Sequence, residues 1–138
     1  MTHSYRGGCA CGALRYHVLG QPAAMVDCQC RQCQRESGTG HQSHMVFAAA
    51  EVEVSGEVSA WELTGDGGTV KRRAFCPACG SPVFMTFPGA PDIFILRPAS
   101  LDDPQAYDPA MVTWTDAAQP WDRVDNTIAR HARMTSSR

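Results

Sequence analysis

Apolar and polar residues alternate in short stretches along this chain. In the clearest stretch, Leu14, Tyr16 and Val18 alternate with Arg15 and His17. Successive side chains of a β-strand point to opposite faces, so this pattern predicts a strand with one buried face. Further short strands are predicted at residues 24–26, 44–48, 52–54, 58–63, 69–75, 82–87, 93–97 and 111–114.

Glycine and proline separate these stretches. The turn segments 65–68 and 88–91 each lie between two predicted strands, and the chain contains 12 Gly and 9 Pro. Many short strands at this spacing, with turn residues between them, favour a mainly β fold. The specific prediction is a small antiparallel β-sandwich or barrel.

Helical structure is predicted at two places. One or two turns are expected over residues 31–37, where Gly38 supplies the stop signal. A terminal helix is expected over residues 125–133, followed by a frayed tail at 134–138. With 138 residues, no internal repeat and no linker-like segment, residues 1–138 are predicted to form a single domain.

Charge and hydropathy exclude several classes of protein. The formal net charge is -2, and no basic block of the kind that binds nucleic acid is present. No apolar run approaches the roughly 20 residues that a membrane helix needs. The N-terminus lacks the apolar core of a signal peptide, so the reducing cytosol is the expected compartment. The cation run Lys71-Arg72-Arg73 is either a solvated strand face or a group that offsets thiolate charge or attracts an anionic ligand.

Seven cysteines fall in three tight clusters, which are Cys9-Ala-Cys11, Cys28-Gln-Cys30-Arg-Gln-Cys33 and Cys76-Pro-Ala-Cys79. In a reducing compartment, such clusters indicate metal or redox chemistry and not disulfides. Seven sulfurs divide naturally into four plus three. Four thiolates close a tetrahedral zinc site, whereas three leave one position for water or substrate. We therefore expect two zinc ions, one structural and one catalytic.

The four-sulfur site is predicted from two of these clusters. Cys76 and Cys79 have the spacing of a zinc knuckle, and Gly80 permits the positive φ that such a turn often requires. A CxxC redox pair is the alternative, although no βαβ pattern accompanies it. In an extended segment, Cys9 and Cys11 point the same way and would complete the site. Joining segments so far apart should stabilise the fold by restricting the unfolded chain.

Cys28, Cys30 and Cys33 remain as a compact trio that can direct three thiolates at one ion. No fourth cysteine is left, so the last position would belong to water, to a substrate atom or to another side chain. His41 and His44 are the competing ligands, and the glycines after the predicted helix are expected to turn the chain away before them. An iron–sulfur cluster is a further alternative, although its usual four-cysteine spacing is absent.

The chain resembles the glutathione-dependent formaldehyde-activating enzyme family, which includes centromere protein V-like proteins. The resemblance covers roughly residues 5 to 122, which would form the core of the domain, with 123–138 as a C-terminal tail. It is carried by Gly8-Cys9-Ala-Cys11-Gly12, Cys28-Gln-Cys30-Arg-Gln-Cys33 with Gly38, Phe75-Cys76-Pro-Ala-Cys79-Gly80-Ser81, Leu101-Asp102-Asp103-Pro104, Trp114 and Trp121.

The resemblance implies a β-sandwich of short tented sheets that carries two zinc ions. Cys9, Cys11, Cys76 and Cys79 would bind the structural ion, and Cys28, Cys30 and Cys33 the catalytic one. The implied activity is that of a carbon–sulfur lyase, which forms or cleaves S-(hydroxymethyl)glutathione from glutathione and formaldehyde. The alternative is a non-catalytic zinc-stabilised module that carries glutathione or binds a partner protein, and a weaker one is metal storage or redox sensing.

Glutathione carries two carboxylates, so its binding site should offer cations or backbone N–H groups. Arg31 and Arg35 flank Cys33 on the predicted helical turn and are the candidates for this contact. Ordinary surface charge, or neutralisation of the thiolates, is the other interpretation of these two arginines. Trp114 and Trp121 are either walls of the cleft or core residues.

Overall fold

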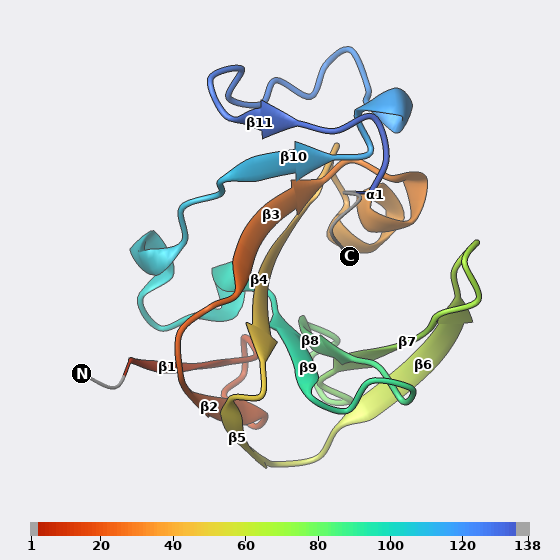
Figure 1. Ribbon diagram of the computed structural model, residues 1–138. Helices are drawn as coiled ribbons and strands as arrows, with labels where there is room; N and C mark the ends of the chain where they lie inside the picture. Colours follow the sequence, from red (N-terminus) through yellow and green to blue (C-terminus); the bar gives the residue numbers. More distant parts are fainter. Residues whose placement is uncertain (1–2, 135–138) are drawn as a thin grey trace.

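The computed structural model describes residues 3–134 (Figure 1). Within these residues the chain forms eleven β-strands, one α-helix and three single-turn 3-10 helices. The strands are β1 (Ser4–Gly8), β2 (Arg15–Leu19), β3 (Ala24–Cys28), β4 (Gln42–Ala48), β5 (Glu51–Ser55), β6 (Ser59–Thr64), β7 (Val70–Phe75), β8 (Pro82–Thr86), β9 (Ile93–Leu96), β10 (Met111–Thr113) and β11 (Ala129–Arg130). The helices are α1 (Arg31–Ser37), η1 (Pro98–Ser100), η2 (Pro104–Ala106) and η3 (Thr115–Ala117).

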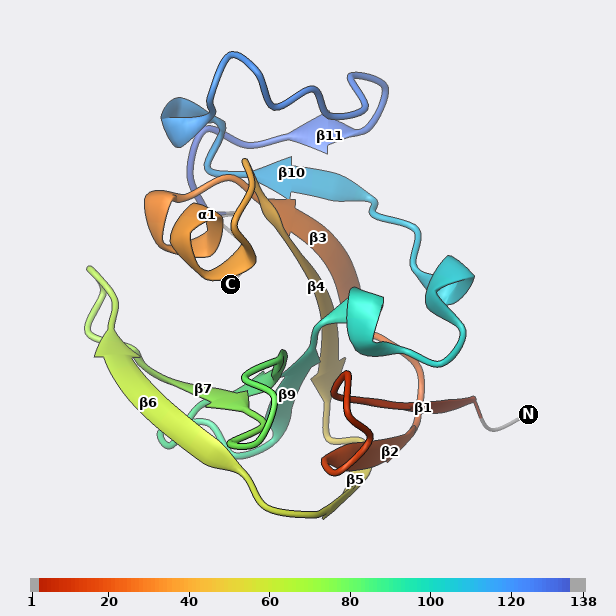
Figure 2. The same cartoon turned by 180° about the vertical axis from the view of Figure 1, so that it is seen from behind.

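The strands form two sheets of unequal size. The smaller is antiparallel with the order β1-β2-β5, and the larger has the order β11-β10-β3-β4-β9-β8-β7-β6. Figures 1 and 2 show the larger sheet curving from β11 at the top, through β4, to the β6–β7 hairpin at the far side. Among the described residues, no helix is both long and apolar enough to cross a membrane.

The prediction of a mainly β chain is confirmed, and every predicted strand has a counterpart. The pairing of β10 differs from the antiparallel prediction, because β10 runs parallel to both β3 and β11. Parallel neighbours cannot be joined by a tight hairpin. The connection from β9 to β10 contains η1 and η2, and that from β10 to β11 contains η3. Neither β1 nor β11 was predicted from the sequence pattern.

The main core lies between the two sheets. Leu14, Tyr16 and Val18 from the β2 region are buried, as their alternation predicts, and they share one cluster with buried residues of β4, β8 and β9. The full cluster is Cys9, Leu14, Tyr16, Val18, Met45, Phe47, Ala74, Cys76, Val83, Phe84, Phe94, Leu96 and Leu101. Burial of each large apolar side chain contributes about 1.5–3 kcal/mol, so this cluster is the main stabilising element. Because two cysteines belong to it, the four-sulfur group lies at the edge of the core.

The predicted helix over 31–37 is confirmed as α1, with Gly38 as its stop. Cys30 is the N-cap residue, and its sulfur accepts a hydrogen bond from the backbone N–H of Cys33. Gly38 has φ 80°, a left-handed conformation that glycine adopts without steric cost, and its N–H donates to the carbonyl of Gln34. Strand β4 then runs back antiparallel to β3.

The predicted helix over residues 125–133 is wrong. The side chain of Asp125 accepts hydrogen bonds from both the backbone N–H and the hydroxyl of Thr127, a turn that competes with helix formation. The chain then continues as β11, and the N–H of His131 donates to the carbonyl of Val112. Of the predicted tail at 134–138, residues 135–138 lie outside the described part of the chain.

Asp122 docks the C-terminal segment against the loop between α1 and β4. It packs directly on Gly40. A Cβ atom at residue 40 would come closer than 3.0 Å to the Cβ and Cγ of Asp122, and real Cβ atoms essentially never make contacts that short. The Asp122 carboxylate accepts hydrogen bonds from Gln29 at 2.9 Å and lies 2.9 Å from Nδ1 of His41. The absence of a side chain at residue 40 therefore permits this contact.

We expect Gly40→Ala to lower the free energy of unfolding by about 1–3 kcal/mol, because the added methyl group displaces Asp122 from its partners. Urea unfolding measures the change. Gly89→Ala is the matched control, since a Cβ at residue 89 meets nothing within 4 Å and its φ is not left-handed. Equal stability of the two variants would contradict the docking role of Asp122.

Candidate metal centres

Four sulfurs meet where two hairpin turns approach each other. Cys9 and Cys11 lie in the turn between β1 and β2, and Cys76 and Cys79 in the turn between β7 and β8. Their ligand atoms all lie within 4.8 Å of one another. The hairpin turn predicted for Cys76 and Cys79 is confirmed, but the first pair lies in a turn and not in an extended segment.

Hydrogen-bond donors surround these sulfurs. The backbone N–H of Leu14 donates to Cys9 at 3.3 Å, and that of Ala78 donates to Cys76 at 3.4 Å. The side-chain and backbone hydrogen bonds from Ser81 lower the pKa of Cys79 to about 5. Such donors favour the thiolate, which is the form that binds metal. Gly80 has φ 78°, as predicted for this turn.

Cys28, Cys30 and Cys33 also converge, with ligand atoms within 4.8 Å of one another. Cys28 ends β3, Cys30 caps α1 and Cys33 lies in its first turn, so the predicted passage from strand to helix is confirmed. Cys28 and Cys33 are buried, whereas Cys30 is partly exposed. Access from solvent to this trio is therefore through the side of Cys30.

The three sulfurs of the trio titrate as one unit. Hydrogen bonds from Cys28 and Cys33 lower the pKa of Cys30 to about 2, and the same contact raises the pKa of Cys28. Hydrogen bonds with Cys28 and Cys30 also raise the pKa of Cys33. Without a metal ion, one thiolate of the trio thus accepts hydrogen bonds from two protonated thiols. A divalent ion replaces those protons and stabilises three thiolates at once.

His44 lies against the trio, contrary to the expectation that glycines turn the chain away from it. Strand β4 pairs with β3 so that His44 stands opposite Val26. This register brings Nε2 of His44 to 3.5 Å from the sulfur of Cys33. Burial, followed by the charge of Arg97, lowers the pKa of His44 to about 3, so its imidazole is neutral. His44 does not belong to the trio's mutual 4.8 Å group.

A buried ionic network lies behind His44. The side chains of Arg73, Arg97 and Glu36 are 4, 7 and 7% exposed. Both guanidinium groups donate to the carboxylate of Glu36, which also accepts from the amide of Gln42 at 2.8 Å. Arg97 further contacts Nδ1 of His44 at 3.0 Å. Two buried cations share one buried anion, which leaves an excess positive charge beside the trio.

The cation run at 71–73 divides between the two faces of β7. Arg72 is exposed and pairs with Glu62 at 3.0 Å, in agreement with the solvated-face interpretation. Lys71 and Arg73 lie on the other face, and the charge of Lys71 lowers the pKa of both Cys30 and His44. The offset of thiolate charge therefore involves Lys71, through its effect on Cys30, whereas Arg73 acts on His44 and Arg72 pairs with Glu62.

Arg31 and Arg35 lie on the exposed side of α1. They are one helical turn apart and share a face, which is roughly opposite to the face of the buried Cys33. Arg31 donates to the side-chain oxygen of Gln34. Both arginines therefore point to solvent on the side of α1 away from the sulfur of Cys33.

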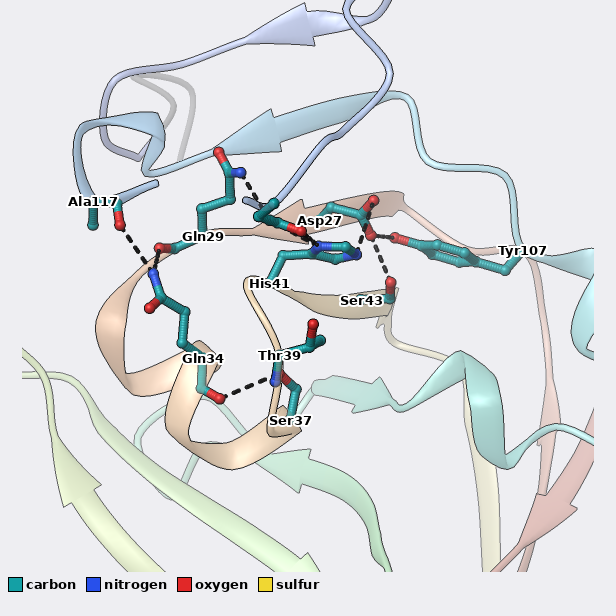
Figure 3. A network of polar contacts seen from close by, with 10 residues as sticks. Asp27, Gln29, Gln34, Ser37, Thr39, His41, Ser43, Tyr107 and Ala117 are labelled. Atoms are coloured by element: carbon teal, nitrogen blue, oxygen red, sulfur yellow. Dashed lines mark hydrogen bonds and ion pairs between the residues drawn. The ribbon is translucent and has the colours of Figure 1, made fainter. Parts of the chain in front are cut away.

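A second polar network, shown in Figure 3, packs around the loop between α1 and β4. Asp27 accepts hydrogen bonds from the hydroxyls of Ser43 at 2.6 Å and Tyr107 at 2.7 Å. His41 lies between Asp27 and Asp122, so it is not directed at the trio. The side-chain amide of Gln34 donates to the carbonyls of Gln29 and Ala117 and holds the loop against η3. Sequence analysis identified none of these partners except His41.

Trp114 and Trp121 differ in exposure. Trp121 is 61% exposed, whereas Trp114 is partly buried. The guanidinium carbon of Arg133 lies 5.7 Å from the centre of the Trp114 ring. Trp114 also has a left-handed φ of 58° at the N-cap of η3. The exposure of Trp121 excludes the core interpretation for that residue.

Both cysteine groups fit zinc. Zn–S bonds of about 2.3 Å in a tetrahedron place sulfurs roughly 3.8 Å apart. The measured separations are 3.6 Å between Cys9 and Cys11 and 3.8 Å between Cys11 and Cys76. All seven cysteines are free of disulfides, which leaves every sulfur available as a ligand. The trio offers the same soft donors with one fewer sulfur.

Comparison with known proteins places this geometry in a family. The family described as glutathione-dependent formaldehyde-activating enzyme matches residues 4–117, which include all seven cysteines. A crystal structure of a Rhodobacter sphaeroides protein is similar, with a TM-score of 0.54 and 20% sequence identity over 70% of this chain and 87% of that chain. At that identity the likeness shows a shared fold alone. The family match covers most of the chain together with both cysteine groups, and this chain therefore belongs to the glutathione-dependent formaldehyde-activating enzyme family.

Proposed function

We propose that this protein is a zinc-dependent carbon–sulfur lyase that reversibly joins glutathione and formaldehyde as S-(hydroxymethyl)glutathione. The observation that carries the proposal is the unequal sharing of sulfur. Four cysteines form one closed group, and three form another that has no fourth sulfur and one partly exposed member, Cys30. Family membership supports glutathione and formaldehyde as the substrates.

In this proposal Cys9, Cys11, Cys76 and Cys79 hold a structural zinc ion, and Cys28, Cys30 and Cys33 hold a catalytic one. Zinc with an open position acts as a Lewis acid that lowers the pKa of a thiol or water bound there. The charge of the buried Arg97 favours the thiolate form of Cys33. Seven free cysteines also support a reducing compartment, and we propose the cytoplasm.

The proposed reaction conserves all atoms and needs no oxidant. In the forward direction the glutathione sulfur bonds to the formaldehyde carbon, and the π pair of the C=O bond moves to its oxygen. The proton that leaves the thiol ends on that oxygen as a hydroxyl group. In the reverse direction the C–S bond breaks and the same proton returns to sulfur. The role left to the chain is to ionise the thiol and to orient it.

The two carboxylates of glutathione need partners outside the trio. We propose that Arg31 and Arg35 provide them, because both are exposed on α1 within two residues of Cys33. Both side chains reach solvent, so a tripeptide can approach them without displacing buried structure. Lys71, whose charge acts on Cys30 from β7, is assigned to the reacting thiol and not to the carboxylates.

Cys30→Ser should reduce catalysed turnover by at least about 100-fold, because loss of a direct ligand exceeds the 10- to 100-fold cost of losing a residue that only orients one. The unfolding midpoint should stay close to that of the unaltered chain. Glutathione and formaldehyde also combine without a catalyst. The measurement is therefore NMR exchange between formaldehyde and the adduct at equilibrium, with the protein-free rate subtracted.

Cys76→Ser is the reciprocal variant, since Cys76 belongs to the four-sulfur group. It should lower the free energy of unfolding by about 2–5 kcal/mol, the range for loss of a crosslink between distant segments. A thermal melt measures the change. Full turnover in Cys30→Ser would refute the catalytic role of the trio, and an unchanged melt in Cys76→Ser would refute the structural role of the four-sulfur group.

The double variant Arg31→Gln/Arg35→Gln should raise the KM for glutathione about tenfold, which corresponds to roughly 1.4 kcal/mol of lost charge-assisted binding. Its kcat should not change, because neither arginine faces the trio. Initial-rate kinetics at varied glutathione concentration separate the two constants. A rise in KM in Lys71→Gln, with none in the arginine variant, would transfer the carboxylate contact to β7.

A further inference from the structure

The hydrogen bonds of His44 define which of its ring nitrogens carries the proton. Nδ1 lies 3.0 Å from a terminal nitrogen of Arg97, and a guanidinium group has only donors. Nδ1 must therefore accept, so it carries no proton. A neutral imidazole holds its single proton on the other nitrogen, Nε2, and that atom lies 3.5 Å from the sulfur of Cys33. His44 consequently donates an N–H···S hydrogen bond to the trio.

From this arrangement we infer that Arg97 keeps the fourth position of the trio's metal open, by holding His44 in a tautomer that cannot ligate. The inference rests on the proposed function, because it takes the trio as a metal site. A metal ligand needs a free lone pair. The lone pair of Nδ1 is directed at Arg97, and Nε2 carries the proton. His44 is thus converted from a competing ligand into a positioning residue for Cys33.

Arg97 can hold this role because its own position is fixed. Its guanidinium is buried and donates to Glu36, whose carboxylate is also held by Arg73 and Gln42. No water can replace it easily at that depth. Glu36 belongs to α1, the helix that contains Cys33, so one element positions both the donor network and the sulfur that it serves.

If Arg97 is removed, the constraint on His44 is lost. In Arg97→Met, the proton of His44 is free to occupy Nδ1, and the lone pair of Nε2 then points at the trio from a distance of a few ångströms. The expected product is a Cys3His site, which is coordinatively closed and resembles a structural centre. Removal of Arg97, which lies outside the metal site, is therefore expected to add a ligand to that site.

The first test uses the unaltered chain, labelled with ¹⁵N and loaded with ¹¹³Cd, an NMR-active substitute for zinc. Long-range ¹H–¹⁵N correlations of the histidine ring should show His44 with its proton on Nε2. Cadmium–proton correlations should connect the trio's ion to the β-protons of Cys28, Cys30 and Cys33 alone. A correlation between cadmium and the His44 ring, or a proton on Nδ1, overturns the inference.

The second test compares Arg97→Met with Arg72→Met, which removes an exposed arginine of β7 that pairs with Glu62. In Arg97→Met, cadmium should gain a correlation to the His44 ring, and the shift of its resonance on addition of glutathione should be lost. Arg72→Met should behave like the unaltered chain. The double variant Arg97→Met/His44→Gln should recover the glutathione-dependent shift.

The outcomes separate this inference from the proposed function. If the trio of the unaltered chain binds no cadmium, the proposed function fails, and the inference fails with it. If cadmium binds and responds to glutathione in both single variants alike, the proposed function stands and the role of Arg97 is refuted. If Arg97→Met does not fold, the tautomer measured in the unaltered chain still decides between the two results.

Discussion

The contact between the sulfurs of Cys11 and Cys76 joins parts of the chain that are 65 residues apart, and the rest of the structure depends on it. One turn belongs to the small sheet and the other to the large sheet, so an ion bound between them fastens both at the edge of their shared core. A small chain with short strands gains much from such a crosslink. In the proposed two-ion arrangement this crosslink adds to the stability of the hydrophobic core, and the trio on β3 and α1 can remain short of one ligand.

Charge near the trio is balanced only when all of its members are considered together. Three thiolates with a divalent ion carry one net negative charge, and the two guanidinium groups of Arg73 and Arg97 exceed the charge of Glu36 by one. A buried excess cation is costly unless an anion lies nearby. The network is therefore most stable when the trio is fully ionised around a metal. Metal binding and the order of the Glu36 network should thus support each other.

Local sequence spacing was sufficient to predict most of the strands, the α1 helix and the convergence of Cys28, Cys30 and Cys33, because each is decided within a few residues. Cys30 and Gly38, for example, are adjacent to the helix that they begin and end. His44 was misplaced because its position depends on the register of β4 against β3, a tertiary property that no local pattern reveals. Arg97 and Glu36 are 61 residues apart, and nothing in the sequence links them. The one available signal was a charged residue directly after the apolar run of β9.

The two cysteine groups differ less in their sulfur atoms than in the hydrogen bonds that neighbouring groups make around them. Around the four-sulfur group, backbone N–H groups donate to sulfurs that are already sufficient to enclose an ion. Beside the trio, a fourth donor atom is available in His44, yet Arg97 occupies one nitrogen and thereby places the proton on the other. The number of nearby donor atoms therefore does not decide whether such a site is closed. The hydrogen-bond partner of the last candidate decides it, and in this chain that partner is held by a carboxylate on the same helix as Cys33.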